Sequence, residues 1–262
     1  MDLQTLTLDT DHRGVATVAL NRPQIHNAFN DVVIAELAAL FGQLGDDPAV
    51  RAVVLTGAGE SFSAGGDLGW MKSMIGYSAA ENETDARRLA ALLDVLDRLP
   101  KPTVARVNGS AFGGGVGLVA CCDIAVGVEG ARFGLTEVRL GLAPATIAPY
   151  VVRAIGAREA RRYFLTGERF QARRALHMGL LHEVVAADEL DATVNLLLDE
   201  LLKGGPTALV ACKRLVEDVQ AATDRESLKR DTAALIARLR VSDEGQEGLQ
   251  AFFARRAPDW IT

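Results

Sequence analysis

Two glycine-rich segments and one carboxylate are the residues of this sequence whose types and spacing suit chemistry. Residues 62–67 read Phe-Ser-Ala-Gly-Gly-Asp, and a triple glycine occupies residues 113–115. Small residues leave backbone N–H groups open to a ligand, and two such groups stabilise negative charge on a carbonyl oxygen. Glu137 follows the second segment and can move a proton beside that oxygen. Together, these residues predict acid–base chemistry next to a carbonyl group.

Each segment taken alone has a simpler interpretation. Residues 62–68 fit an ordinary turn between a strand and a helix, and Glu137 fits a carboxylate at the start of a helical turn. The triple glycine fits a phosphate-binding loop, since the first amides of a helix are unpaired and lie at the positive end of its dipole. However, the lysine and hydroxyl of a P-loop are missing, and so is the acidic residue of a dinucleotide-binding motif. It is therefore the combination of both segments with Glu137 that predicts acid–base chemistry next to a carbonyl group.

Composition restricts the class of protein. The 262 residues are 49% apolar and 24% charged, which suits one large α/β unit or a core with a small appendage. The net charge of −6 and the lack of a basic run disfavour nucleic-acid binding. Three cysteines, including the adjacent Cys121 and Cys122, form no disulfide framework and indicate a reducing compartment. No apolar stretch approaches the roughly 20 residues of a membrane span, and the N-terminus resembles no signal peptide. We expect a cytoplasmic protein without a membrane partner.

The apolar periodicity predicts strands and helices in alternation up to about residue 127. Strands are expected over residues 3–9, 15–20, 52–55 and 103–107, and helices over residues 30–46 and 83–99. This alternation is typical of a layered α/β fold with a mostly parallel sheet. After Gly141 the pattern is helical except for a strand at residues 183–185. Helices are expected over residues 147–155, 157–165, 171–178, 189–203, 206–220 and 225–239. We divide the chain into a core, residues 1–200, and a helical C-terminal segment, residues 201–262.

Ten segments follow one another in an order that resembles the crotonase (enoyl-CoA hydratase/isomerase) superfamily over essentially the whole chain. They are Asn21-Arg22-Pro23, Asn27-Ala28, residues 62–67, Asn108-Gly109, residues 113–115, residues 122–125, Phe133-Gly134, Glu137, Leu140-Gly141 and, as a closing helix, residues 252–258. The resemblance implies a spiral of ββα turns followed by a helical segment. It also implies a homotrimer or hexamer, with the C-terminal helices at the subunit contacts.

The same resemblance implies a coenzyme A thioester as substrate, with no tightly bound cofactor and no metal. The backbone N–H groups of Ala64 and Gly114 would hold the thioester oxygen, and Glu137 would be the catalytic glutamate. Coenzyme A would lie across the loop at residues 24–26 and the first glycine-rich segment, with His26 fitting a solvent-exposed loop histidine equally well. These residues are Gln24, Ile25, His26, Ala64, Gly65, Gly66, Asp67 and Leu68.

One position departs from the pattern of hydratases with two glutamates, because Gly117 stands where they carry the second one. Gly117 lies three residues after Gly114, so both would face the same side of a helix. We therefore expect Gly117 to leave space in the substrate pocket, which Trp70 also lines. The hydrolase branch of the family has an aspartate after its glutamate, but residues 142–146 contain none. Three further carboxylates either reach the site or form solvated helix faces: Glu81, Glu83 and Asp85.

Three functions remain open at this stage. The first is a hydratase that uses Glu137 alone, the second a Δ3,Δ2-enoyl-CoA isomerase, and the third a non-catalytic acyl-CoA-binding homologue. Residues 111–118, 142–150 and 158–165 resemble bacterial hydratases of 3-methylglutaconyl-CoA and γ-carboxygeranoyl-CoA, which act in leucine and acyclic terpene breakdown. That resemblance favours a branched, carboxylated acyl group, which would need a cation nearby. The candidates are Lys72, Arg87, Arg88 and Arg139.

Overall fold

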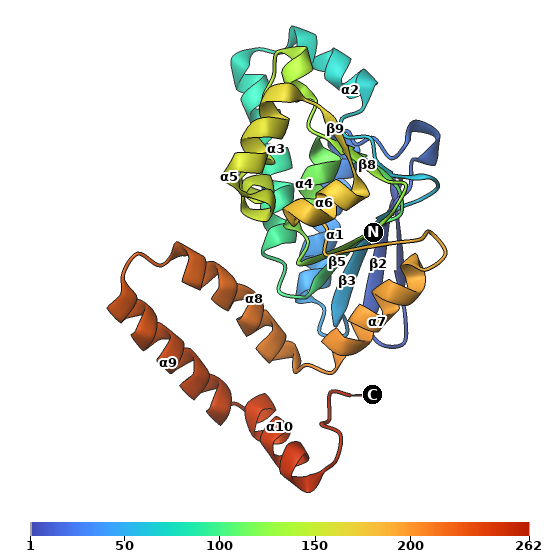
Figure 1. Cartoon of the computed structure of the whole chain (residues 1–262). Helices are drawn as coiled ribbons and strands as arrows, with labels where there is room; N and C mark the ends of the chain where they lie inside the picture. The colour runs from blue at the N-terminus through green and yellow to red at the C-terminus, as the bar shows by residue number, and fades with distance from the viewer. Residues whose placement is uncertain (1, 262) are drawn as a thin grey trace.

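From β3 to β8, successive strands of the chain alternate between two sheets. The computed structural model describes residues 2–261 and is drawn in Figure 1. The larger sheet has the order β1-β2-β3-β5-β7-β10, and all neighbours in it are parallel except β1 and β2. Its strands are β1 (Leu6–Thr10), β2 (Val15–Leu20), β3 (Ala52–Gly57), β5 (Thr103–Val107), β7 (Ile124–Val128) and β10 (Glu183–Val185).

The smaller sheet has the order β4-β6-β8-β9, and its first three strands are parallel. Its strands are β4 (Ser61–Ser63), β6 (Ser110–Phe112), β8 (Arg132–Gly134) and β9 (Arg169–Gln171). In the pairs β3–β4, β5–β6 and β7–β8, the first strand belongs to the larger sheet and the second to the smaller one. A helix or 3-10 turn follows each pair. This threefold repetition confirms the predicted spiral of ββα turns.

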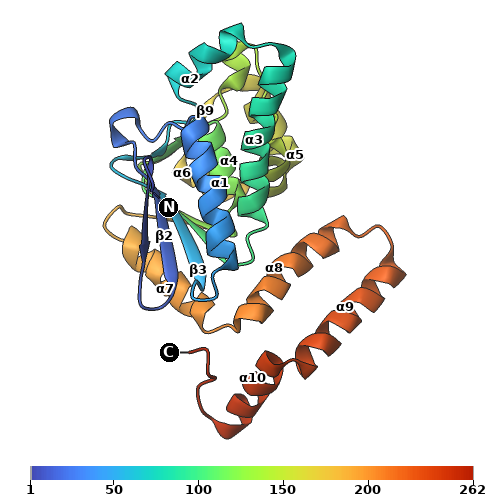
Figure 2. The same cartoon turned by 180° about the vertical axis from the view of Figure 1, so that it is seen from behind.

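Helices cover the larger sheet on both sides. The longer ones of the core are α1 (Asp31–Asp46), α3 (Ala79–Asp97), α5 (Ala148–Thr166) and α7 (Leu190–Leu202), and the shorter ones are α2 (Leu68–Ser73), α4 (Gly114–Cys121) and α6 (Ala172–Met178). Single 3-10 turns are η1 (Pro23–Ile25), η2 (Met74–Gly76) and η3 (Glu137–Leu140). Helix α3 packs against α1 and α4, while α7 packs on β3, β5 and β7 (Figure 2).

Helix boundaries follow local capping signals. Asn30 caps α1, since its side chain accepts a hydrogen bond from the N–H of Val33. Helix α3 begins four residues earlier than expected, because Ser78 and Glu81 form a capping box. Helix α5 contains the non-helical Gly156 between the two segments that the sequence predicts as separate helices.

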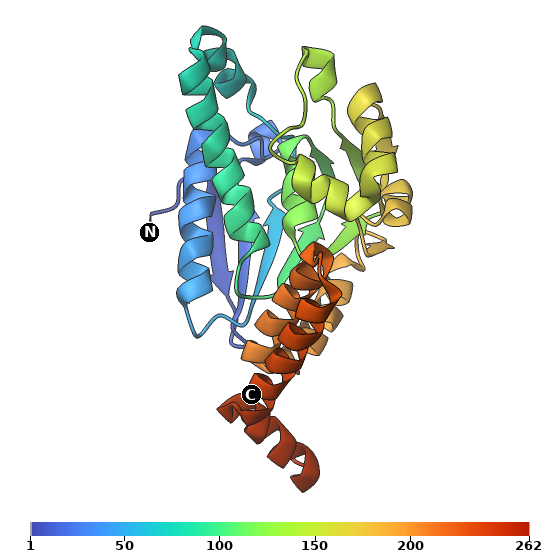
Figure 3. The ribbon, with the colours of Figure 1, turned by 90° about the vertical axis from the view of Figure 1, so that its left-hand side faces the viewer.

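The last three helices form an arm that projects from the layered part of the molecule (Figure 3). They are α8 (Pro206–Ala221), α9 (Arg225–Val241) and α10 (Asp243–Ala254), and neither α8 nor α9 has a fully buried residue. Ion pairing of Lys213 with Asp123, at 2.9 Å, joins α8 to the core. The predicted closing helix over residues 252–258 was placed too late, because α10 ends where Arg255 turns to a φ of 53°. Within residues 2–261 no helix is long and apolar enough to cross a membrane.

Candidate active site

Three loops meet at one edge of the smaller sheet. Strands β4, β6 and β8 are adjacent and parallel, so the segments that follow them emerge at the same edge. These segments are a first glycine corner (residues 64–67), a second glycine corner (residues 113–115) and the 3-10 turn η3, which begins with Glu137. The topology therefore brings together the residues that the sequence singles out, although the first corner lies about 70 positions before Glu137 in the chain.

The first corner rests directly on the second. Gly65 has a φ of +86°, and a Cβ placed on it would lie 2.8 Å from the carbonyl oxygen of Phe112. Only glycine fits this backbone conformation and this close approach. Ser63, which is fully buried, donates from its hydroxyl to the carbonyl of Asn27 and accepts from the N–H of Gly65. The close contact with Phe112 on one side and the hydrogen bonds of Ser63 on the other thus fix the position of the first corner.

The N–H of Ala64 is already used within the chain. It donates to the carbonyl oxygen of His26 at 2.8 Å, which contradicts the expectation that Ala64 supplies an oxyanion donor. The free amide in this corner belongs to Gly66. Its two neighbours form a bridge with Phe29: Phe29 donates to the carbonyl of Gly65, and Asp67 donates to the carbonyl of Phe29. Among the hydrogen bonds of residues 2–261, the N–H of Gly66 has no protein acceptor.

The second corner offers the first amide of α4. Gly113 precedes the helix with a φ of 49° and donates its N–H to the carbonyl of Gly134. Gly114 is the first helical residue, so its N–H has no partner one turn earlier. No acceptor for it occurs in the part of the chain that the structure describes. Gly66 and Gly114 therefore provide two unpaired N–H groups from loops that touch one another.

The carboxylate of Glu137 lies over the second corner. A Cβ placed on Gly113 would be 3.1 Å from Glu137 Oε1, so any side chain there would press on the carboxylate. The other oxygen, Oε2, is buried and has no hydrogen-bond partner within residues 2–261. Burial raises the pKa of Glu137 above its ordinary value, and only a backbone hydrogen bond opposes the shift. Such a group binds a proton more readily than an exposed glutamate, as a general acid–base requires.

The residues expected to contact coenzyme A lie around the first corner. Gln24 and His26 are exposed, and Nδ1 of His26 is 3.0 Å from the hydroxyl oxygen of Ser61. Leu68 is a large apolar side chain, yet it is 80% exposed. Asp67 instead has a structural role, since it caps α2 through the N–H groups of Gly69 and Trp70 and pairs with Arg22 at 3.0 Å. Burial opposes ionisation of Asp67, but these bonds outweigh it and lower the pKa of that carboxyl.

Gly117 does not open any space. It is buried in α4, and a Cβ placed on it would overlap Ile147 Cγ2 and lie 2.9 Å from Ile147 Cβ. Ile147 is 2% exposed and immediately precedes α5. The expectation that Gly117 leaves room for substrate is therefore wrong, because the glycine accommodates another side chain of the protein. No local pattern links Ile147 to Gly117, because the two residues lie 30 positions apart on different turns of the spiral.

Trp70 lies beside the first corner, as expected for a pocket residue. Its Cζ3 atom would be 3.8 Å from a Cβ on Gly66, and the side chain is half-buried. Trp70 also lines a cavity of about 700 Å³ between α1, α2 and α3, together with Asp85 and Arg88. Burial raises the pKa of Asp85, while Arg88 and a hydrogen bond from Trp70 oppose the shift.

The other candidate charges are engaged elsewhere or exposed. Glu81 closes the capping box of α3 and also lines this cavity, while Glu83 pairs with Arg87 on an exposed face of the helix. Lys72 is exposed, and Arg139 packs against Gly167. Arg88 is thus the one cation of the four that lines the cavity beside Trp70.

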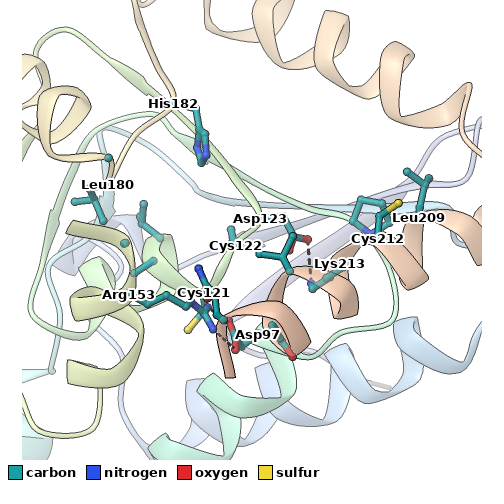
Figure 4. Close-up of a pocket in the computed structure, with 18 of the residues that line it drawn as sticks. Asp97, Cys121, Cys122, Asp123, Arg153, Leu180, His182, Leu209, Cys212 and Lys213 are labelled. Atoms are coloured by element: carbon teal, nitrogen blue, oxygen red, sulfur yellow. Dashed lines mark hydrogen bonds and ion pairs between the residues drawn. The ribbon is translucent and has the colours of Figure 1, made fainter. Parts of the chain in front are cut away.

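A second cavity, of about 470 Å³, lies at the other end of α4 (Figure 4). It contains the ion pairs Asp97–Arg153 and Asp123–Lys213, and Glu137 is not among its lining residues. Cys121, Cys122 and Cys212 all line it; the first two are buried, and Cys212 is exposed. Glu137 and the two glycine corners therefore lie outside this cavity. Within residues 2–261 there is no cluster of three His, Cys, Asp or Glu side chains able to hold a metal ion.

Comparisons with known proteins agree on one family. The family described as enoyl-CoA hydratase/isomerase matches residues 10–262. A Thermus thermophilus protein, provisionally named an enoyl-CoA hydratase, is 37% identical over 93% of this chain and 96% of its own length. The structure of an enoyl-CoA hydratase from Shewanella pealeana superposes with a TM-score of 0.95 at 42% identity, covering 98% of this chain and 96% of that one. Pseudomonas aeruginosa AtuE also superposes with a TM-score of 0.95, at 39% identity, covering 99% of this chain and all of its own.

Proposed function

Because the chain belongs to the enoyl-CoA hydratase/isomerase family, we propose that it adds water across the 2,3-double bond of an enoyl-CoA with Glu137 as its acid–base. One observation carries the proposal: the buried, unpaired Oε2 of Glu137 belongs to a carboxylate that lies against Gly113, next to the free amide of Gly114. A non-catalytic acyl-CoA-binding protein would not need such a carboxylate, whose burial is unfavourable.

The chemistry follows from where charge develops. When water adds to C3 of the conjugated thioester, negative charge builds up on the thioester oxygen. The N–H groups of Gly66 and Gly114 stabilise this charge, and each donor of this kind contributes about 3 kcal/mol to the transition state. Ionised Glu137 takes a proton from the attacking water and then returns a proton to C2. Coenzyme A enters as part of the substrate, beside residues 24–26 and Leu68, and no further cofactor takes part.

The structure gives a specific reason to keep isomerisation as a second candidate. Ile147 fills the space beside Gly117, so an apolar side chain stands near the position of the second glutamate of other hydratases. An isomerase needs only one base, which moves a proton between C2 and C4, and it gains from excluding water. Glu137 could perform that transfer without any other group.

The acyl group is the least supported part of the proposal. A branched, carboxylated group such as 3-methylglutaconyl draws support from sequence resemblance and from Arg88 in the cavity beside Trp70. Gly117 gives it no support, because this glycine packs against Ile147 and leaves no space for a branched group. The same cavity also contains Asp31, Asp67, Glu81 and Asp85, which would repel a second carboxylate.

A turnover assay with three substrates tests these alternatives. Hydration of crotonyl-CoA or 3-methylglutaconyl-CoA removes the absorbance of the conjugated thioester, whereas isomerisation of a 3-enoyl-CoA creates it. We expect loss of absorbance with at least one 2-enoyl-CoA. Activity on the 3-enoyl-CoA alone would identify an isomerase, and no turnover of any of the three would contradict the proposed function.

We also propose that the arm joins copies of this chain into a trimer or hexamer, with residues 1–200 as the catalytic core and residues 201–262 as the assembly segment. Phe252 and Phe253 of α10 pack edge to face at 5.5 Å and are 76% and 79% exposed. Val219, Ile236 and Val241 are also exposed on the arm. Apolar surface of this kind is typical of a protein–protein contact.

A further inference from the structure

Phe29 contacts both glycine corners of the site. Its main chain forms the bridge to the first corner: its N–H donates to the carbonyl of Gly65 at 2.8 Å, and its carbonyl accepts from Asp67 at 3.0 Å. Gly66, with the free amide, lies between these two bonds. Any shift of the Phe29 main chain therefore moves the N–H of Gly66.

The ring of Phe29 supports the second corner. A Cβ placed on Gly114 would overlap the tip of the ring and lie 2.9 Å from Cε1 and 3.1 Å from Cε2. The ring thus packs directly on the backbone of the residue that supplies the other free amide. Phe29 is 3% exposed, so it is held in place by the core rather than by solvent-exposed contacts.

Trp70 restricts the ring from another side. The two ring centroids are 6.3 Å apart, with an angle of 53° between the planes. A phenyl ring has only two side-chain torsions, and close packing removes most of the freedom in both. The distance between the main chain of Phe29 and its ring tip is fixed by covalent geometry. Phe29 accordingly behaves as a rigid spacer between the Gly66 loop and the start of α4.

We propose that Phe29 is a positioning residue that sets the relative placement of the Gly66 and Gly114 amides. The proposal rests on the proposed function, because the amides matter only if they hold a thioester oxygen. A displacement of about 1 Å in a donor is enough to cost orders of magnitude in rate. Phe29 need not touch the substrate to have this effect.

The test replaces Phe29 with leucine, which keeps the main-chain bridge but withdraws support from Gly114. The matched control is Phe41→Leu, since Phe41 is also buried but lies in α1, and none of its atoms is among the nearest neighbours of the corner glycines. We expect Phe29→Leu to lower kcat at least tenfold with KM changed less than threefold, and Phe41→Leu to keep kcat within twofold although both variants lose thermal stability. Phe29→Met, which restores most of the length, should recover part of kcat.

A spectroscopic measurement separates failure of this inference from failure of the proposed function. A 3-arylacryloyl-CoA with an electron-donating amino group absorbs at longer wavelength when its thioester oxygen accepts hydrogen bonds. The wild type should shift this probe to the red, and Phe29→Leu should bind it with a clearly smaller shift. An unchanged shift and an unchanged kcat in Phe29→Leu, or an equal loss of kcat in Phe41→Leu, would overturn the role of Phe29. If the wild type binds the probe without any shift, the N–H groups of Gly66 and Gly114 do not hold the thioester oxygen. That result would contradict the proposed function and, with it, the role of Phe29.

Discussion

Ile147 occupies the space that a side chain at residue 117 would need. The two residues come from different turns of the spiral, and a Cβ on Gly117 would lie 2.9 Å from Ile147 Cβ. Gly117 is thus explained by packing between α4 and the start of α5. Where the resemblance places the second glutamate of two-glutamate hydratases, the folded chain has a glycine packed against an isoleucine and not an opening.

Gly117→Glu should therefore destabilise the protein rather than improve its catalysis. The new side chain would overlap Ile147, and overpacking of this kind costs about 1–3 kcal/mol before the burial of a charge is counted. Urea denaturation measures the loss. Gly42→Ala is the control, because Gly42 lies in α1 with no atom within 4 Å of a Cβ, so alanine should stabilise there by up to about 1 kcal/mol. A Gly117→Glu protein as stable as the wild type would refute the packing explanation.

Removing the amide of Gly66 should suppress turnover. Gly66→Pro deletes the N–H, and we expect kcat to fall by about 100-fold or more. Gly66→Ala keeps the N–H, and its Cβ would meet no atom closer than Met71 at 3.5 Å, so its kcat should stay within about tenfold. Circular dichroism establishes that both variants fold. Equal activity of the two variants would show that the donor lies elsewhere.

Glu137→Gln should stabilise the folded protein at neutral pH. The pKa of Glu137 is raised in the folded state, so ionisation of this carboxyl opposes folding as the pH rises through that pKa. Glutamine has no charge to bury. The variant should therefore have the higher Tm at about pH 8, and the difference should vanish below the pKa of an unfolded glutamate. Glu83→Gln, on an exposed face of α3, serves as the control for loss of a carboxylate at the surface. A Tm difference that does not depend on pH would contradict the effect of burial.

The arm should mediate assembly. Phe252→Ser with Phe253→Ser removes the most exposed aromatic pair of α10, and we expect the double variant to sediment as a smaller species than the wild type. Leu165→Ser is a matched control, since Leu165 is 71% exposed at the end of α5, outside the arm. A wild type that sediments as a clean monomer at micromolar concentration would exclude the proposed assembly.

The sequence predicts elements best where they carry a strong local pattern. Strand β2, strand β5 and the start of α8 at Pro206 occur where expected, because apolar runs and a proline mark them clearly. The strands of the smaller sheet were not predicted, since each has three residues and lies beside a glycine-rich or polar turn, so no apolar run marks it. This sheet nevertheless brings the site together, and its existence follows only from the register of β4, β6 and β8.

The candidate site shows the same division. Glu137 and Gly114 are found where motifs place them, but the choice between Ala64 and Gly66 depends on which amide a distant carbonyl accepts from. His26 and Phe29 decide it through hydrogen bonds that no local pattern encodes. Ile147 likewise meets Gly117 only in the folded chain.

The kcat of Glu137→Gln tests the central claim most directly. Glutamine keeps the size of the side chain but cannot take a proton from water, so chemistry is separated from packing. With crotonyl-CoA or whichever enoyl-CoA the wild type hydrates best, we predict that kcat falls at least 100-fold while affinity for the acyl-CoA is nearly unchanged. A folded Glu137→Gln protein that hydrates the substrate at close to the wild-type rate would contradict the account.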